Sequence, residues 1–74
     1  MEVEVRLFGG FREGRFKRRA LVLAEGAPLR DVLQQLHIPE EEVSLPLVNG
    51  QYSKLDRLLS DNDVLSVFPA MGGG

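Results

Sequence analysis

One stretch of this chain repeats its apolar residues with the spacing of a helix. Four apolar positions follow one another at i, i+3, i+4 and i+7 and so share one helical face: Leu29, Val32, Leu33 and Leu36. Pro28 suits the first turn of such a helix, and Pro39 disfavours helical geometry at the residue before it. The pattern predicts a helix over residues 28–37. Its apolar stripe must be buried against another layer of structure, because one short helix cannot enclose a core.

The segments before this helix alternate in the way that strands do. Residues 2–7 carry polar side chains at even positions and apolar ones at odd positions, which predicts a half-buried strand. Residues 16–24 predict a returning strand with Leu21 and Leu23 facing the core and Val22 facing away. Glycines interrupt the chain between the two strands. We therefore expect an antiparallel hairpin with a long, basic, glycine-rich tip.

Shorter strands are expected after the helix. Residues 40–44 form a polar connector, and residues 45–48 a strand that Pro46 marks as an edge or irregular one. Asn49-Gly50 is a strong signal for a tight turn between strands, and residues 51–53 then form the next short strand.

The last strand is expected at residues 64–68, after a turn over residues 60–63. Leu65 and Val67 are its core candidates, and Pro69 ends it. A helical crossover after a hairpin favours a parallel pairing of the first and last strands.

This order of elements predicts an α+β domain of the β-grasp, or ubiquitin-like, fold. We expect a mixed sheet of four to five strands with one main helix across one face. Residues 1–68 would form this single domain, and residues 69–74 a flexible C-terminal tail ending in Gly-Gly.

Composition excludes several kinds of chemistry. The 74 residues contain no cysteine and one histidine, so thiolate metal sites, disulfides and a Ser-His-Asp triad have little or no support. We expect no metal site and no catalytic residue in this chain. Nine basic and 11 acidic residues give a net charge of −2, which argues against general nucleic-acid binding. No apolar run is long enough to span a membrane, and the start does not look like a signal peptide, so we expect a cytoplasmic protein.

The C-terminus, Gly72-Gly73-Gly74, is the most unusual segment. Three glycines contribute nothing to a packed fold, and the simple interpretation is a frayed end or a remnant of expression. The functional interpretation is a tail that threads into a channel too narrow for side chains. Residues 69–74 would reach roughly 20 Å when extended, enough to place the terminal carboxylate inside another protein.

These residues resemble the MoaD/ThiS family of ubiquitin-like sulfur carriers, which includes the small subunit of molybdopterin synthase and the thiamine-biosynthesis carrier. The resemblance rests on three segments: Val48-Asn49-Gly50, Asp61-Asn62-Asp63 before Leu65, and the ending from Phe68 to Gly74. Members often have Gly-Asp where this chain has Asn62-Asp63, and alanine or serine where it has Gly72. Both departures leave the pathway open.

The resemblance implies a carrier rather than an enzyme. A ubiquitin-activating-like adenylyltransferase would adenylate the Gly74 carboxylate with its own ATP and Mg²⁺, so this chain would bind no cofactor. Sulfur from a persulfide would then replace AMP, and the resulting thiocarboxylate would serve as sulfur donor in molybdopterin or thiamine-type cofactor biosynthesis. A synthase such as the molybdopterin synthase large subunit would accept the sulfur.

Two other functions stay open at this point. A ubiquitin-like modifier would also use an activated Gly74, joined to a lysine amine. A nucleic-acid or ribosome-binding module would use the basic hairpin, residues 12–19, and would not need the tail.

Partner binding is expected at Gly72, Gly73, Met71 and Phe68. The side chain of Phe68 should point out of the core, because it lies on the opposite alternation phase from Leu65 and Val67.

The basic hairpin is either a solvated strand end or a surface for phosphate or an acidic partner, and we expect it to affect only encounter rates. His37 is expected to sit in a favourable position at the helix C-terminus.

Overall fold

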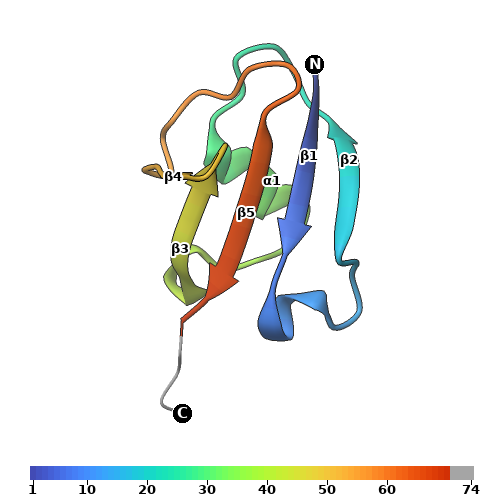
Figure 1. Ribbon diagram of the computed structural model, residues 1–74, viewed down its shortest axis with the longest axis vertical. Helices are drawn as coiled ribbons and strands as arrows, with labels where there is room; N and C mark the ends of the chain where they lie inside the picture. The colour runs from blue at the N-terminus through green and yellow to red at the C-terminus, as the bar shows by residue number, and fades with distance from the viewer. Residues whose placement is uncertain (71–74) are drawn as a thin grey trace.

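A five-stranded mixed sheet carries a single α-helix on one face, and the opposite face is open (Figure 1). The computed structural model describes residues 1–70. The strand order is β2-β1-β5-β3-β4, with β1 and β5 parallel at the centre and the other pairs antiparallel. The β-grasp prediction is therefore confirmed. The elements are β1 (Glu2–Leu7), β2 (Arg18–Val22), α1 (Leu29–Gln35), β3 (Val43–Val48), β4 (Gln51–Tyr52) and β5 (Val64–Pro69).

The core lies between the sheet and α1, as the alternation of apolar residues in the strands and their helical spacing in α1 require. The odd positions of β1 and the predicted core positions of β5 are fully buried: Val3, Val5, Leu7, Leu65 and Val67. From the helix, Leu29, Val32 and Leu33 meet them. Phe11, in a 3-10 turn at the hairpin tip (Gly9–Arg12), also reaches this core, although the alternation pattern did not identify it. Among the residues described, no helix is long and apolar enough to cross a membrane.

The helix is shorter than its apolar stripe predicts. It begins at Leu29, one residue after the predicted start, because Pro28 is extended and precedes the helix, and it ends at Gln35. His37 takes a left-handed backbone conformation with φ of 58°, which reverses the chain and returns Ile38 to the core. Leu36 consequently lies beyond the last helical residue and is half-buried. The end of the helix was therefore predicted wrongly at His37.

The strand boundaries also differ from the prediction by a few residues. Strand β2 is shorter than residues 16–24, because the chain before it forms the wide tip of the hairpin. The first part of the expected polar connector is a 3-10 turn (Glu40–Glu42), and β3 begins directly after it at Val43. The pairing of β3 with β5 shifts register between Val43 and Leu45, so β3 is irregular as predicted, but the irregularity precedes Pro46, which pairs in register with Val67.

Side-chain hydrogen bonds join two turns next to the start of β5. Asn49 and Gly50 both have positive φ, 53° and 84°, as a two-residue hairpin turn with right-handed strand twist requires. The Asn49 side chain donates to the Asp63 carboxylate at 2.9 Å and accepts from the Val64 amide at 2.9 Å. Asp63 also accepts from the Ser60 amide at 2.8 Å. Two of the three segments that carry the family resemblance, Val48-Asn49-Gly50 and Asp61-Asn62-Asp63, thus have a structural role, because these bonds hold both turns.

Candidate functional site

Phe68 points to the open face of the sheet, as its alternation phase predicted. Its ring stacks on the ring of Phe8, with centroids 4.2 Å apart and planes 8° from parallel. Phe8 comes just after β1 and next to β5 because those strands run parallel, and its amide donates to the Val67 carbonyl at 3.2 Å. Phe8 is not among the site residues predicted from the sequence. It continues the even-numbered, open-face phase of residues 2–7, and that phase could have identified it.

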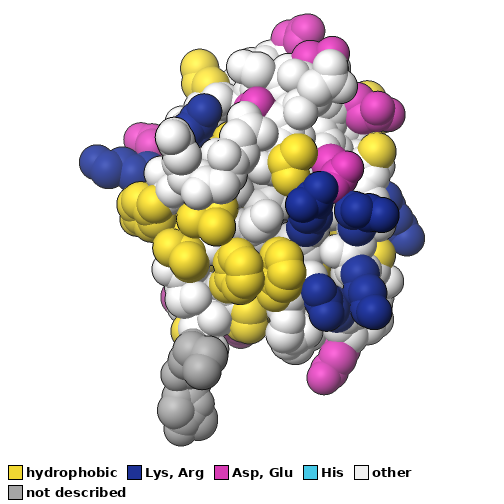
Figure 2. Space-filling model, viewed as in Figure 1, with side chains coloured by type: hydrophobic (Ala, Val, Ile, Leu, Met, Phe, Trp, Pro, Cys, Tyr) yellow, Lys and Arg dark blue, Asp and Glu magenta, His cyan; other side chains and the backbone are white. Residues whose placement is uncertain are grey.

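An apolar depression surrounds this aromatic pair where the chain leaves the sheet. We call it the tail-root patch and define it by four side chains: Phe8, Leu45, Phe68 and Pro69. Gly9 and Ser44 complete its lining. Leu45 is 40% exposed although it is large and apolar. Figure 2 shows apolar side chains gathered on the open face over β3 and β5, next to the point where the chain leaves the domain.

The backbone at the tail-root patch is held in place by hydrogen bonds. The Ser44 hydroxyl donates to the Pro69 carbonyl at 2.8 Å, and the Ala70 amide donates to the Glu42 carbonyl at 2.8 Å. Strand β5 therefore continues through Pro69, one residue past its predicted end. Pro69 and Ala70, which we expected in the tail, are instead bonded to the domain.

Gly9 brings the hairpin tip into contact with this exit point. Its φ is +58°, and a Cβ atom there would lie 2.8 Å from Cγ of Pro69. Both facts favour glycine at this position, because a side chain would be strained and would displace Pro69. Pro69 and Ala70 are thus held by contacts from Glu42, Ser44 and the hairpin tip.

The other predicted site residues, Met71, Gly72, Gly73 and Gly74, lie outside the described residues. Their roles stay predictions. Within residues 1–70 no three histidine, aspartate or glutamate side chains are grouped so as to hold a metal ion.

Basic side chains occupy the other half of the open face, over β1 and β2 (Figure 2). They surround a hollow that shares Phe8 with the tail-root patch: Arg6, Arg12, Lys17 and Arg18. Arg12 lies with its guanidinium carbon 5.1 Å from the centre of the Phe8 ring, and its Nε donates to the Leu7 carbonyl at 2.7 Å. Arg6 pairs with Glu4. The open face is therefore apolar on one side and basic on the other.

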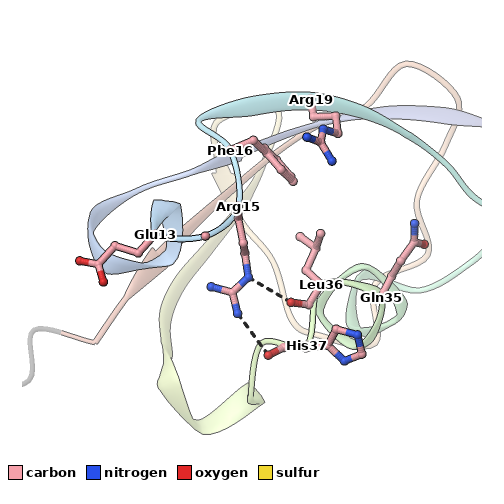
Figure 3. A pocket seen from close by; sticks show the side chains of 8 residues that line it. Glu13, Arg15, Phe16, Arg19, Gln35, Leu36 and His37 are labelled. Carbon is pink, nitrogen blue, oxygen red and sulfur yellow. Dashed lines mark hydrogen bonds between the residues drawn. The ribbon is translucent and has the colours of Figure 1, made fainter.

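Arg15 belongs to the interior side of the tip and not to this basic surface. Its guanidinium donates to the backbone carbonyls of Leu36 at 3.0 Å and His37 at 3.3 Å (Figure 3). It also donates to the Phe11 carbonyl at 3.2 Å. The carbonyls of Leu36 and His37 follow the end of α1, where backbone acceptors lack helical partners. Arg15 thus joins the hairpin tip to the end of the helix. We expected it to affect only encounter rates, and these contacts give it a structural role instead.

Replacing Arg15 should therefore cost stability. Arg15→Ala leaves three carbonyls without their charged donor, and we expect a loss of about 1–2 kcal/mol. In a domain of this size that corresponds to a fall in Tm of about 5–15 °C, measurable by circular dichroism. Arg15→Lys should recover only part of the loss, because one ammonium cannot reach all three acceptors. Arg18→Ala is the matched control, since this exposed arginine should be neutral to stability, and equal Tm values for the two alanine variants would contradict the assigned role.

The central parallel pair, the crossing helix and the C-terminal strand that ends at an apolar surface define a ubiquitin-like protein of the β-grasp fold. A family model described as the ThiS family matches residues 5–74. The match covers almost the whole chain and extends to its last glycine, so the chain belongs to the ThiS family. No curated protein sequence matches the chain significantly.

Solved structures agree with this assignment. A Pyrococcus furiosus protein assigned as molybdopterin converting factor, subunit 1, has a TM-score of 0.78 and 30% identity over 93% of this chain and 97% of that one. A chain from the complex of subunits 1 and 2 of molybdopterin-converting factor from Helicobacter pylori has a TM-score of 0.65 and 29% identity, with both chains fully covered. SAMP1 from Haloferax volcanii has a TM-score of 0.79 over the whole of both chains, and at 21% identity it supports the fold alone.

Proposed function

We propose that this chain is a sulfur carrier whose C-terminal Gly74 is converted to a thiocarboxylate. The observation that carries the proposal is the ThiS-family match, because it includes the glycine ending as well as the domain. In the proposed reaction an adenylyltransferase of the ubiquitin-activating type uses ATP and Mg²⁺ to join AMP to the Gly74 carboxylate, releasing pyrophosphate. Adenylation is needed because a free carboxylate is a poor electrophile.

Sulfur then enters from a persulfide on a partner protein. The terminal persulfide sulfur attacks the acyl carbon and AMP leaves, and a second thiol cleaves the S–S bond, so that the thiocarboxylate stays on Gly74 and a disulfide stays on the partner. The chain contains no cysteine, so in this scheme all transferable sulfur comes from outside. The chain itself acts as carrier, and the catalytic groups belong to its partners.

We propose a synthase large subunit as the sulfur-accepting partner. Support comes from the Helicobacter pylori neighbour, whose structure is a complex of subunits 1 and 2 of molybdopterin-converting factor. The tail-root patch supplies a surface for such an assembly, because an exposed apolar cluster with an aromatic pair is typical of a protein contact. The product, whether molybdopterin or a thiamine-type cofactor, follows from which synthase binds.

The chemistry can be tested by mass spectrometry of the C-terminus. After incubation with ATP, cysteine and a lysate of the source cells, intact mass should increase by the difference between one sulfur and one oxygen atom. A thiol-selective alkylating reagent should then label the C-terminal peptide, because there is no cysteine to compete. A variant that lacks Gly74 is the control and should stay unlabelled. A ladder of high-mass conjugates without labelling would indicate a protein modifier and contradict the carrier.

The tail-root patch should contribute strongly to binding of the partner. Phe68→Ala removes one member of the stacked pair, and we expect it to weaken binding to the activating enzyme or synthase about tenfold or more, measured by calorimetry. Leu58→Ala is the matched control, because Leu58 is an apolar residue with 64% exposure that lies outside the patch. If circular dichroism shows that both variants are folded and their affinities are equal, the tail-root patch is not part of the interface.

A further inference from the structure

The outer edge of β2 offers free backbone groups to a further strand. β2 is the last strand on its side of the sheet and pairs only with β1 in the described part of the chain. Met1 and Leu23 exchange hydrogen bonds at 2.8 Å, and the Leu7 amide bonds the Lys17 carbonyl. In an antiparallel ladder such pairs alternate with pairs that point outward. The backbone N–H and C=O groups of Arg18, Ala20 and Val22 therefore point away from the sheet.

Side chains along this edge change from basic to apolar. Arg18 and Arg19 stand at its start, one on the open face and one on the helix face, and both are exposed. Ala20 follows, and Val22 at the far end is 75% exposed. Charged residues usually protect an edge strand from pairing, but here they cover only the first half. The second half is apolar and open.

A hollow beside the edge provides room for side chains of an added strand. It lies between the start of β2 and the end of α1, and Figure 3 shows Phe16 and Leu36 directed into it. The Arg19 guanidinium carbon lies 4.6 Å from the centre of the Phe16 ring and forms the basic side of the hollow. Arg15 forms a further wall, and its three bonds to backbone carbonyls hold that wall in place.

We propose that the β2 edge binds an extended, acidic segment of a partner protein as a sixth strand of the sheet. Main-chain hydrogen bonds to the outward groups supply affinity, and side-chain contacts supply selectivity. Acidic residues of the segment lie opposite Arg18 and Arg19, and aliphatic residues lie opposite Ala20 and Val22. An aliphatic side chain on the helix face enters the hollow beside Phe16 and Leu36.

Charge selects this occupant over the alternatives. Arg18 and Arg19 lie on the edge and Lys17 directly precedes it, so a second copy of the chain would add further positive charge beside them. A nucleic acid would be attracted to the arginines, but the apolar half of the edge offers no charged side chain to its phosphates. The surface is also separate from the tail-root patch, because β1 lies between β2 and β5 (Figure 1). One partner could therefore hold the tail while another binds the edge, and the inference does not depend on the proposed function.

The test uses the full chain and two synthetic peptides, followed by NMR. One peptide has a run of valines followed by a run of glutamates, and the second has the reverse order, because either strand direction is allowed. We expect one of them to bind with a Kd of roughly 0.1–1 mM. The amides of Arg18, Ala20 and Val22 should show the largest shifts and should exchange more slowly with solvent. A valine–lysine peptide should leave the spectrum unchanged.

Variants separate the backbone contribution from the charge contribution. Ala20→Pro removes one outward N–H and should weaken binding about tenfold without breaking the pairing with β1. Should that variant unfold, an N-methylated valine–glutamate peptide makes the same test on the unaltered chain and should not bind. The double change Arg18→Glu and Arg19→Glu should also weaken binding about tenfold or more, whereas Lys54→Glu, the same charge change at an exposed site elsewhere, should not.

Three results would overturn the proposal. Undiminished binding of the N-methylated peptide would show that the edge makes no main-chain bonds. Dimerisation through the β2 edge, seen by sedimentation and by the same amide shifts without peptide, would identify a second copy as the occupant. Tighter binding of a single-stranded RNA to the same amides, with no response to either peptide, would identify a nucleic-acid surface.

Discussion

Leu33→Ala should bring the domain close to unfolding at room temperature. Leu33 is completely buried in the middle of the helical stripe, between α1 and the central strands. Truncating such a leucine costs about 2–5 kcal/mol, because transfer free energy is lost and a cavity is left. A small domain has only about 5 kcal/mol of stability, so the loss is comparable to the whole. Urea unfolding followed by circular dichroism measures it.

Leu58→Ala is the matched control for this substitution. Leu58 is 64% exposed, so the same truncation should change the free energy of unfolding by no more than about 0.5 kcal/mol. If Leu33→Ala were as stable as the unaltered chain, the packing of α1 against the sheet as described here would be wrong.

Adding one alanine after Gly74 should nearly abolish activation of the C-terminus. Ala70 is bonded to the domain, so the terminal carboxylate lies four residues beyond an anchored point, within about 14 Å of it when extended. The added residue moves the carboxylate roughly 3.5 Å and places a Cβ atom at the reacting position. A displacement of about 1 Å can already cost about a hundredfold in rate. ATP–pyrophosphate exchange with the matching activating enzyme is the measurement.

Gly73→Val should be similarly impaired, because a β-branched side chain cannot pass a channel of glycine width. Arg18→Ala serves as control and should change the exchange rate only about tenfold or less, and mainly at low salt. Normal exchange with the alanine extension would contradict the assignment of the reaction to Gly74.

Local patterns were sufficient to predict most of the scaffold. The alternation in residues 2–7, the spacing of Leu29, Val32 and Leu33, and the Asn49-Gly50 turn each arise from a period or a backbone preference that neighbouring residues express by themselves. The outward direction of Phe68 follows from the same alternation. These are the features that the structure reproduces.

Features that depend on distant parts of the chain were missed or misjudged. Phe8 becomes part of the tail-root patch only because the parallel pairing of β1 and β5 places it beside Phe68. The composition of the tip presents Arg15 as one more surface charge, yet it bonds carbonyls that the fold brings close to it. The alternation phase gives the face of the sheet on which Phe8 lies, but neighbouring residues reveal neither its stacking partner Phe68 nor the carbonyl acceptors of Arg15.

The amino-acid sequence by itself determined the two layers, the core faces of the strands and helix, and the glycine ending that directs attention to Gly74. Tertiary structure alone decided where α1 ends, how Pro69 and Ala70 are held, and which side chains share the open face. The physical reason is the range of the interactions. Periodicity and turn preference act between near neighbours, whereas hydrogen bonds and stacking across the sheet join residues that only the completed fold brings into contact.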